Sequence, residues 1–568
     1  HVTGDGTHTV ADLIAITNSD PNRGDGHEKP LTKIPVDQVM FAYLEKHAIR
    51  TDYVPARGER VFLRDGINLS TGGTAKDVTD LVHPRVVRMC ERVAIVMGLD
   101  ICGIDLVLGD ISGPPPRAGG GVIEVNASPG IRMHHFPSEG HSRNVASAIV
   151  DMLYPAGAAS RIPIVSITGT NGKTTVTRMV GHILSEMGKV VGLTTTDGIY
   201  IGNECLAEGD TTGPQSAKTI LTDPTVEVAV LETARGGIAR RGLGYDWSDV
   251  GVITNIQPDH IGQDGIKSVD DLVFVKSLVA ERVREGGTLV LNADDEQLAR
   301  LMEAPRVRKV KKQVVYFSLH ANHLLIRKHL ASGGTAYFVR EGWIVEATGH
   351  KEHPIIKSST IPVTLNGTAE FNVANALAAI AASRAMGATR EQARSFIMTF
   401  RSLGHNPGRG NLYHVAGGYV MLDYGHNPDA FKAICRMASQ WEGRKVTGIV
   451  GVPGDRANSV IVEAGLAAAK GFNRIIIKED ADLRGRAKGE VAGLLCEAIK
   501  AKASERDCSI VLNEIEALEL ALKEIGQGDV IIVFYDKLKP LVELLERHGA
   551  VPAAKLENLV TTLSVAKG

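Results

Sequence analysis

One short stretch limits what this chain can fold into: an apolar run, a glycine turn and a helix-like segment follow one another directly. Residues 162–167 (IPIVSI) have the character of a strand buried in a parallel sheet, and residues 174–187 have helical character. The turn between them contains Gly169 and Gly172, and Lys173 precedes the helix. Backbone N–H groups of such a turn and of a helix N-terminus converge on one anion. The stretch therefore predicts an α/β domain with a phosphate-binding loop.

We expect this loop to bind the phosphates of ATP, with Lys173 supplying a positive charge and Thr174 a ligand for Mg²⁺. The general pattern for such loops has glycine at position 167, where this chain has Ile167, and the loop carries Gly169 instead. The loop is therefore a variant of the general pattern, and this restricts the protein families to which the chain can belong. The residues expected to contact ATP here are Gly169, Thr170, Asn171, Gly172, Lys173, Thr174 and Thr175.

Length and composition exclude several classes of protein. With 568 residues the chain is too long for one core, and about 100–200 residues per domain suggests three or four domains. A formal net charge of -2 gives no reason to expect nucleic acid as a partner. No apolar run approaches the ~20 residues that cross a bilayer, so no membrane partner is expected. The six cysteines never form a C-x-x-C pair, which favours a reducing cytoplasm over a disulfide framework or a zinc site.

The pattern of strand-like and helix-like segments predicts three domains. Residues 1–158 have mixed patterning, typical of an α+β fold. Residues 161–400 alternate strand and helix, as a parallel α/β sheet does, and residues 401–568 repeat this alternation in a second, Rossmann-like α/β domain. Residues 401–410 (RSLGHNPGRG) look like a hinge between the last two.

A family resemblance rests on several motifs in order. Residues 168–175 (TGTNGKTT) resemble the ATP loop of the Mur ligase family, which includes muramyl-peptide ligases and folylpolyglutamate synthases. The further motifs that are similar to that family lie at residues 231–233 (LET), 254–260 (TNIQPDH), 371–379 (FNVANALAA), 423–430 (DYGHNPDA) and 454–456 (GDR). The resemblance covers residues 161–568 and implies a P-loop-type central domain and a Rossmann-like C-terminal domain.

The resemblance implies roles for residues of the central domain. Glu232 and His260 would hold metal ions, and Asn375 would lie near the adenine. In the family a lysine is often carbamylated to supply another metal ligand. Lys276 is either that lysine or an ordinary surface lysine on a helix.

The C-terminal motifs imply further contacts. Arg409 would contact phosphate near the hinge, Asp423 would contact the nucleotide, and His426 would contact the substrate. The family often has glutamate two residues after the arginine, where this chain has Asn411. That departure narrows the subfamily.

The chemistry that follows from these residues is carboxylate activation. A carboxylate attacks the γ-phosphate of ATP to give an acyl phosphate, and an amine then displaces phosphate. Because the transferring phosphoryl group receives little covalent help from protein, positioning and charge neutralisation dominate its transfer. The candidate catalytic residues are Lys173, Glu232, His260, Lys276 and Arg409.

The first 158 residues carry a different candidate site. Asp105 lies on one predicted strand, and Glu124 and Asn126 lie on the next, where alternation places them on one face. Two carboxylates and an amide oxygen suit a hard Mg²⁺ ion. Residues 103–107 (GIDLV) and 123–130 (IEVNASPG) look like the metal-binding end of an ATP-grasp domain, and Arg132 could meet a carboxylate substrate.

An ATP-grasp domain joined to a Mur ligase resembles the cyanophycin synthetase family. The stretches that carry this resemblance include residues 2–9 (VTGDGTHT), 231–247 (LETARGGIARRGLGYDW) and 406–412 (NPGRGNL). It implies that the ATP-grasp site adds L-aspartate to the polymer backbone and the Mur-type site adds L-arginine to the aspartate side chain. It also implies Mg²⁺, one ATP per step, a cyanophycin primer or polymer as partner, and a homodimer or homotetramer. Because the chain begins as if inside the ATP-grasp domain, we expect an incomplete aspartate-adding site and a complete arginine-adding site.

Two other hypotheses remain. The chain could be another Mur-type amide ligase, of the muramyl-peptide or folylpolyglutamate kind, with a fused front domain. It could also be a non-catalytic scaffold that binds nucleotide. The ATP-grasp-like motifs at residues 103–107 and 123–130 argue against the first alternative, because such ligases have no reason to carry them. A scaffold need not keep metal and phosphate ligands together, so the second alternative is disfavoured by Lys173, Thr174, Glu232 and His260.

Overall fold

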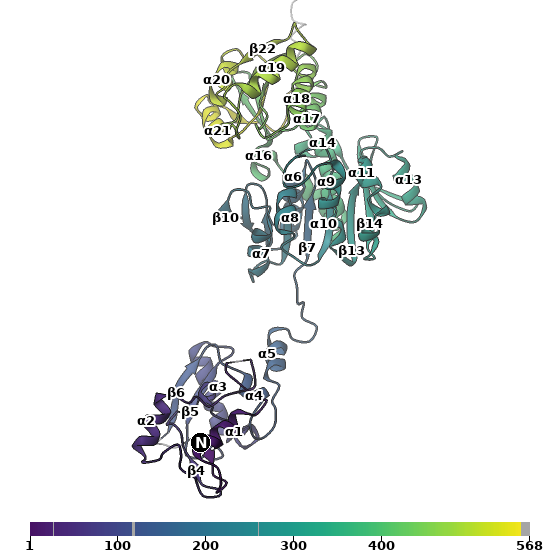
Figure 1. Cartoon of the computed structure of the whole chain (residues 1–568). Coiled ribbons are helices and arrows are strands. Elements are labelled where there is room, and N and C mark those ends of the chain that lie inside the picture. The colour runs from purple at the N-terminus through teal and green to yellow at the C-terminus, as the bar shows by residue number, and fades with distance from the viewer. Residues whose placement is uncertain (27, 67, 116–119, 260, 558–568) are drawn as a thin grey trace, which may run out of the picture. The chain divides into compact units, whose positions relative to one another are not determined.

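The computed structural model describes residues 1–568 apart from 27, 67, 116–119, 260 and 558–568. The chain divides into two compact units, residues 1–160 and residues 161–568 (Figure 1), and each is described by itself. In the described part of the chain, no helix combines the length and the apolar character that crossing a bilayer requires. The three-domain limits drawn from the sequence stay a prediction.

The first unit is a small α+β assembly of short elements. Val10, Leu13 and Ile14 of α1 pack with Met40 and Leu44 of α2 in its core. The strands pair two by two: β1 with β4, β2 with β3, and β5 with β6. The strands are β1 (Val2–Thr3), β2 (Arg23–Gly24), β3 (Leu31–Thr32), β4 (Arg60–Val61), β5 (Gly103–Val107) and β6 (Gly121–Asn126). The helices are α1 (Val10–Asn18), α2 (Gln38–Lys46), η1 (Leu69–Thr71), η2 (Thr79–Leu81), α3 (Pro84–Met97), α4 (Arg132–His135) and α5 (Val145–Leu153).

The second unit begins with a large mixed sheet of eleven strands, here called the central sheet. Its order is β10-β9-β8-β11-β7-β12-β13-β14-β15-β16-β17. The strands from β8 to β15 in this order run parallel, as the apolar runs predict, whereas both ends of the sheet are antiparallel hairpins. The strands are β7 (Ile164–Thr168), β8 (Val191–Thr194), β9 (Gly198–Ile201), β10 (Glu204–Glu208), β11 (Val228–Glu232), β12 (Ser248–Ile253), β13 (Val283–Asn292), β14 (Gln313–Ser318), β15 (Thr335–Arg340), β16 (Trp343–Thr348) and β17 (Lys351–Lys357).

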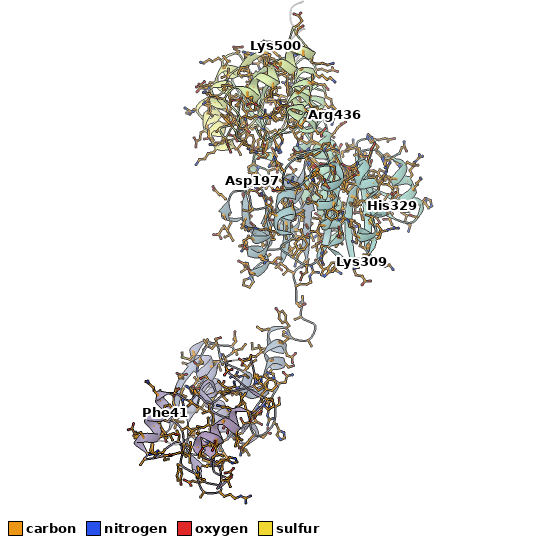
Figure 2. All side chains as sticks on the ribbon, in the orientation of Figure 1. Phe41, Asp197, Lys309, His329, Arg436 and Lys500 are labelled. Atoms are coloured by element: carbon orange, nitrogen blue, oxygen red, sulfur yellow. The ribbon has the colours of Figure 1, made fainter. Side chains whose placement is uncertain are left out.

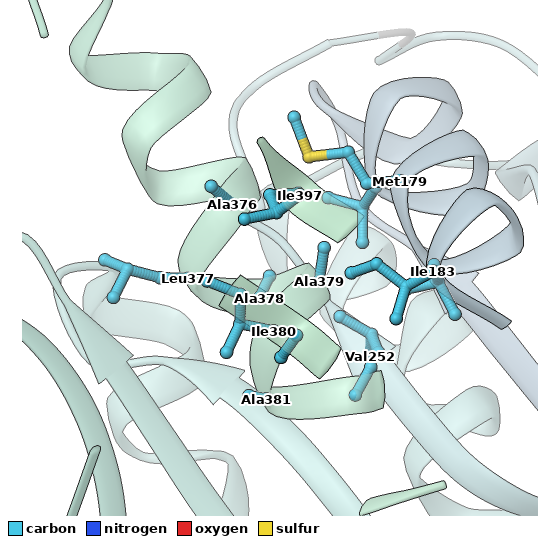
Figure 3. Packing of buried hydrophobic residues seen from close by; sticks show 14 of the residues in the cluster. Met179, Ile183, Val252, Ala376, Leu377, Ala378, Ala379, Ile380, Ala381 and Ile397 are labelled. Atoms are coloured by element: carbon cyan, nitrogen blue, oxygen red, sulfur yellow. The ribbon is translucent and has the colours of Figure 1, made fainter. Parts of the chain in front are cut away.

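Two long helices build the core of this part. Met179 and Ile183 of α6 lie beside the alanine-rich face of α14 and Val252 of β12 (Figure 3). Small alanine side chains let α14 approach α6 and the sheet closely, so the helix that starts at the phosphate loop is held firmly. The helices around the central sheet are α6 (Lys173–Glu186), α7 (Pro214–Thr222), α8 (Arg235–Arg241), α9 (Val269–Lys276), α10 (Leu278–Glu281), α11 (Glu296–Ala299), η3 (Leu301–Glu303), α12 (Pro305–Arg308), α13 (Leu324–Ala331), η4 (Ser358–Thr360), η5 (Pro362–Thr364), α14 (Glu370–Ala385) and α15 (Arg390–Ile397).

A second sheet of seven strands, here called the C-terminal sheet, completes the unit. Its order is β22-β21-β20-β23-β19-β18-β24. The first five strands in this order run parallel to one another, β18 pairs antiparallel with β19, and β24 pairs antiparallel with β18. Figure 2 shows Asp197 beside the central sheet and Arg436 beside the C-terminal sheet. The strands are β18 (Arg409–Val415), β19 (Gly418–Asp423), β20 (Val446–Val450), β21 (Arg474–Ile477), β22 (Asp507–Ile510), β23 (Val530–Phe534) and β24 (Val551–Pro552). The helices are α16 (Ser402–His405), α17 (Pro428–Ala438), α18 (Asn458–Gly471), α19 (Glu490–Lys502), α20 (Glu514–Lys523) and α21 (Leu538–Arg547).

The predicted hinge is more ordered than its composition suggests. Residues 402–405 form α16, and β18 already begins at Arg409. The side chain of Asn411 holds this turn, because its Oδ1 accepts the N–H of Gly408 at 2.6 Å and its Nδ2 donates to the carbonyl of Asn406 at 3.0 Å. The connection between the two sheets is therefore a braced turn.

Candidate active site

The phosphate loop connects β7 to α6 and requires glycine at two positions. Gly169 has φ +150° and Gly172 has φ +84°, a left-handed conformation that a Cβ disfavours. A Cβ at Gly169 would overlap Thr254 Oγ1, and a Cβ at Gly172 would overlap Asn375 Oδ1. Gly172 is also the N-cap of α6, so the loop leads directly into the helix N-terminus.

The end of β12 braces this loop. The backbone N–H of Asn171 donates to Asn255 Oδ1 at 2.9 Å, and that of Thr170 donates to the carbonyl of Asn255 at 2.9 Å. Thr254 Oγ1 donates to the carbonyl of Asn171 at 2.6 Å. Because residues 169–172 are tied to a buried strand end, the loop has its shape before any ligand arrives.

Two opposite charges lie at the loop, those of the half-buried Lys173 and the buried Glu232. Lys173 Nζ donates to the carbonyl of Thr170 at 3.0 Å, and burial lowers the pKa of this ammonium although Glu232 opposes the shift. Burial raises the pKa of the Glu232 carboxyl, while Lys173 and Arg409 act in the opposite direction. The Glu232 side chain is 2% exposed, and its Oε2 accepts the N–H of Thr196 at 3.2 Å.

Glu232 and Thr174 fit a hard divalent cation. Glu232 Oε1 is buried and has no hydrogen-bond partner among the described residues. Thr174 Oγ1 lies 3.2 Å from Thr196 Oγ1 on the same side of the loop. A buried carboxylate oxygen without a partner is costly unless a cation or donor reaches it, and Mg²⁺ prefers oxygen ligands.

The remaining predicted ligand of this site, His260, lies outside the described residues. In the chain as described, no three histidine, cysteine, aspartate or glutamate side chains gather in a way that could hold a metal ion. Glu232 and Thr174 are therefore the ligand candidates that the structure places at the loop.

Lys276 is a buried residue, which excludes the interpretation as a surface lysine. It is the last residue of α9 and is 3% exposed, and its Nζ donates to Thr170 Oγ1 at 2.8 Å. Burial, with the charge of Lys173 next in effect, lowers the pKa of Lys276 to about 7. A large share of this amine is therefore neutral near pH 7.

The start of the C-terminal sheet brings Arg409 to the loop. Its Nη2 donates to Thr196 Oγ1 at 3.1 Å, and its guanidinium carbon lies 4.3 Å from the centroid of the Tyr424 ring. Asp423 ends β19 and accepts the N–H of Gly425 at 2.9 Å. Burial raises the pKa of Asp423, although the charge of Arg409 acts in the opposite direction.

Further polar contacts join the two sheets across the site. Asn427 Nδ2 donates to Asn171 Oδ1 at 3.0 Å, which ties the N-cap of α17 to the phosphate loop. Arg456, 4% exposed, lies with its Nε 3.3 Å from Asp259 Oδ1. His426 Nε2 lies 3.8 Å from Asp259 Oδ2. Sequence analysis did not select Asn427 or Asp259 individually, although both lie inside the motifs that it quoted.

These elements surround one cavity of ≈ 810 Å³. One part of its wall is apolar and includes Phe317, Phe371 and Ile434, and there Asn375 Nδ2 donates to Asn372 Oδ1 at 3.1 Å. Such a wall suits a flat purine base. The predicted residues that line this cavity are Gly169, Thr170, Asn171, Gly172, Lys173, Thr174, Thr175, Glu232, Lys276, Asn375, Arg409, Asp423 and His426.

The other predicted residues lie in the first unit. Asp105 of β5 and Glu124 of β6 are direct cross-strand partners, and both are exposed. Asn126 Nδ2 donates to Glu124 Oε1 at 2.9 Å, and a metal site that also includes Asp105 stays a prediction. Arg132 is the first residue of α4, and its Nη1 donates to the carbonyl of Lys29 at 2.9 Å.

Comparison with family models identifies two matching segments. Residues 167–383 match the Mur ligase middle domain, and residues 408–534 match the Mur ligase, glutamate ligase domain. The resemblance drawn from the motifs is thereby confirmed for both segments.

The chain is also similar to curated proteins over almost its whole length. It is 44% identical to a cyanophycin synthetase of Crocosphaera subtropica over 552 residues, which are 97% of this chain and 63% of that protein. It is 45% identical to a cyanophycin synthetase of Synechocystis sp. over 97% of this chain and 62% of that protein. The chain therefore spans less than two thirds of the length of these relatives.

A solved structure shows the same kind of fold. The crystal structure of a bifunctional folylpolyglutamate synthase/dihydrofolate synthase with Mn, AMPPNP and L-glutamate bound has a TM-score of 0.50 to this chain at 17% identity. The match covers 71% of this chain and 92% of that one. At this identity the likeness concerns the fold alone.

Proposed function

Because this chain belongs to the Mur ligase family, we propose that its second unit activates a carboxylate with ATP and joins it to the α-amine of L-arginine. The carboxylate is the side chain of an aspartate in a cyanophycin primer or polymer, multi-L-arginyl-poly-L-aspartate. Support for these substrates comes from relatives named cyanophycin synthetase at 44% and 45% identity.

The proposal rests on one observation: a buried carboxylate oxygen that has no hydrogen-bond partner among the described residues lies at the phosphate loop. Glu232 Oε1 lies in the cavity wall together with Lys173 and Thr174, and it has no hydrogen-bond partner in the described chain. A divalent cation held by Glu232 and Thr174 would neutralise charge on the ATP phosphates. A scaffold that merely binds nucleotide would have no need for that oxygen to stay free.

The residues of the loop position the first step. The backbone N–H groups of the loop and the α6 N-terminus, together with Lys173, would hold the phosphate groups, and Arg409 would face them from the C-terminal sheet. The acceptor carboxylate oxygen attacks the γ-phosphorus and ADP leaves, which gives an acyl phosphate. Thr170, Thr174 and Glu232 are buried, which would limit the access of water to the acyl phosphate beside them.

The second step forms the amide bond. The neutral α-amine of arginine attacks the carbonyl carbon of the acyl phosphate, and phosphate leaves with the bonding electron pair. The amine loses a proton in this step. Lys173 and Arg409 are placed to stabilise the negative charge that collects on the departing phosphate.

For the first unit we propose a nucleotide-linked Mg²⁺ site made by Asp105, Glu124 and Asn126. Three oxygen-bearing side chains on one hairpin support it, as does the resemblance to the metal-binding end of an ATP-grasp domain. The site would serve addition of L-aspartate to the polymer backbone. Arg132 is the candidate for contact with a carboxylate of that substrate.

The test supplies ATP, Mg²⁺, a short aspartyl primer and one amino acid at a time to the full chain, and follows phosphate release. We expect release that depends on arginine and that Lys173→Ala lowers by about 100-fold or more, because a preorganised cation at the phosphates is lost. Lys189→Ala is the matched control, since Lys189 pairs with Glu227 beyond the other end of α6.

Equal release with meso-diaminopimelate or glutamate would contradict the proposed amine and favour a muramyl-peptide or folylpolyglutamate type of ligase. Arginine-dependent release that survives Lys173→Ala would contradict the proposed site.

A further inference from the structure

The charges of the cavity wall pose a problem for an arginine substrate. Basic side chains line the cavity from both sheets, among them Lys173, Lys276, Arg235, Arg409 and Arg456. They suit phosphates and carboxylates, and they repel a guanidinium group. An arginine therefore needs a carboxylate in this wall whose charge no other side chain already neutralises. The carboxylates that line the cavity are Asp210, Glu232, Asp259, Asp264, Asp423, Asp429 and Asp455.

Most of these carboxylates already face a basic partner. Asp259 lies 3.3 Å from Arg456 Nε. Asp264 lies 2.9 Å from Arg235 Nη1, and Asp455 lies 2.9 Å from Arg484 Nη1.

Two more are held near the phosphate end of the cavity. The charge of Lys173 acts on Glu232, and the charge of Arg409 acts on Asp423. Their negative charge is therefore balanced inside the site.

Asp429 and Asp210 remain. Asp429 shares the ammonium of Lys432, 3.4 Å away, with Glu463, and its neighbours Ala430, Ala433 and Ile434 belong to the apolar wall. Asp210 forms no ion pair or hydrogen bond with a lysine or arginine in the part of the chain that the structure describes, although its charge acts on Lys173. Its side chain is exposed at the cavity.

The position of Asp210 is fixed beside the reacting end of the site. Its Oδ1 accepts the N–H of Thr212 at 3.1 Å and the hydroxyl of Thr212 at 2.7 Å. The next residue, Thr211, donates its hydroxyl to the carbonyl of Thr195 at 2.7 Å. Thr196 in turn contacts Glu232, Thr174 and Arg409. The turn that holds Asp210 therefore lies at the cavity, close enough to the phosphate loop for the charge of Asp210 to act on Lys173.

We propose that Asp210 binds the guanidinium group of the arginine whose α-amine is joined at this site. The inference rests on the proposed function and names the residue that selects its amine substrate. Asp210 Oδ2 can accept charge-assisted hydrogen bonds from a guanidinium group, and these are stronger than neutral ones. With the guanidinium held at Asp210, the extended side chain of the arginine substrate directs its α-amine toward the acyl phosphate.

The test compares arginine with citrulline, which has the same length and a neutral ureido group. Asp210→Asn removes the charge and keeps an oxygen for Thr212. We expect the variant to lower kcat/KM for arginine by about 10- to 100-fold, the loss that follows removal of a charge-assisted hydrogen bond. The ratio of kcat/KM for arginine to that for citrulline should fall by a similar factor, and the KM for ATP should stay within about twofold.

A matched control exists outside the cavity. Asp223 makes the same turn, because its Oδ1 accepts the N–H of Thr225 at 2.8 Å and the Thr225 hydroxyl at 2.6 Å. Asp223→Asn should leave the preference for arginine unchanged. If Asp210→Asn does not fold, Asp210→Ser offers an oxygen near Thr212 without the charge, and Asp210→Glu should restore part of the preference.

The outcomes separate this inference from the proposed function. A wild-type chain that releases no phosphate with arginine would refute the proposed function. A wild-type chain that does so, with the arginine-to-citrulline ratio unchanged in Asp210→Asn and Asp210→Ser, would overturn only the role of Asp210. If Asp429→Asn instead lowers the ratio of kcat/KM for arginine to that for citrulline, the guanidinium binds at Asp429, and the proposed role of Asp210 is overturned.

Discussion

At this site, loss of hydration changes the pKa values of single charged residues. Glu232 is buried and Lys173 is half-buried, and loss of hydration shifts the pKa of each toward its neutral form, raising that of the acid and lowering that of the amine. A phosphate group and a cation entering between them would restore full charge on both. The site is therefore prepared for a charged ligand.

Lys276 leads to a prediction at the same scale. Its amine has a pKa of about 7 because it is buried, so above pH 7 most of it is neutral. A neutral amine can take up CO₂ to form a carbamate and a proton, and the carbamate would add an anionic oxygen near Thr170. We expect phosphate release to fall when dissolved CO₂ is removed, and Lys276→Ala to lower it by about 10- to 100-fold, the range seen when support of a metal site is lost.

Rescue distinguishes this role from packing. Acetate or formate should restore part of the activity of Lys276→Ala, since either can supply the missing carboxylate oxygens. Lys267→Ala, at an exposed position before α9, is the control and should behave like the wild type. Full activity in CO₂-free buffer would contradict the prediction.

Residue identities could be predicted from sequence where a motif lies in one segment. The glycines and Lys173 follow from the strand–turn–helix pattern, and Glu232 follows from the resemblance of residues 231–233 to a family motif. Thr196 and Asp210 could not be found in this way, because each reaches the cavity from a segment distant in sequence. Their contacts arise only when the strand ends are brought together.

Among the elements, parallel strands and long helices were the most predictable. The strand expected over 162–167 and the helix expected over 174–187 correspond to β7 (Ile164–Thr168) and α6 (Lys173–Glu186), since an apolar run and a helical repeat define them. Strands β15, β16 and β17 were not predicted. They lie at one end of the central sheet and have a shorter, half-polar pattern, which is a weaker signal than a fully buried run.

That end of the sheet is fixed to the helices by one buried carboxylate. Glu346 of β16 accepts from Arg384 Nε of α14 at 2.7 Å, from Arg390 Nε of α15 at 2.8 Å and from the Tyr337 hydroxyl at 2.9 Å. Burial alone would raise the pKa of Glu346, but its partners hold it below the usual 4.5.

We expect Glu346→Gln to lower the free energy of unfolding by about 2 kcal/mol, because two arginines lose their counter-charge. The contribution of a carboxylate with a lowered pKa is present above its unfolded pKa and is lost as pH falls through the folded value. The difference between wild type and variant, measured by urea unfolding, should therefore shrink below about pH 4.5. Glu352 of β17 forms an exposed ion pair with Arg340 of β15. Glu352→Gln should lower the free energy of unfolding by less than about 1 kcal/mol. An equal effect of both variants would contradict this account.

The whole molecule consists of two units that have separate candidate sites. The cavity is lined by residues of the second unit, and Asp105, Glu124 and Asn126 belong to the first. Residues 151–160, which precede the boundary, are exposed along their whole length. Sequence alone could not show which residues would assemble into one cavity.

Exposure of this segment predicts where a protease cuts first. Elastase cleaves after small residues, and residues 157–160 (GAAS) offer it an exposed backbone free of helix and strand. We expect limited digestion to yield two fragments that meet between residues 154 and 161, identified by mass spectrometry. Because residues of the second unit line the cavity that we propose adds arginine, phosphate release with arginine should survive the cut with little change. Lys173→Ala should still lower it by about 100-fold or more in the cut protein. Replacing residues 157–159 by proline, which elastase does not accept, gives a resistant control with the same activity. If cutting at this segment removes arginine-dependent release while the resistant control keeps it, the arginine-adding site requires the intact connection between the units.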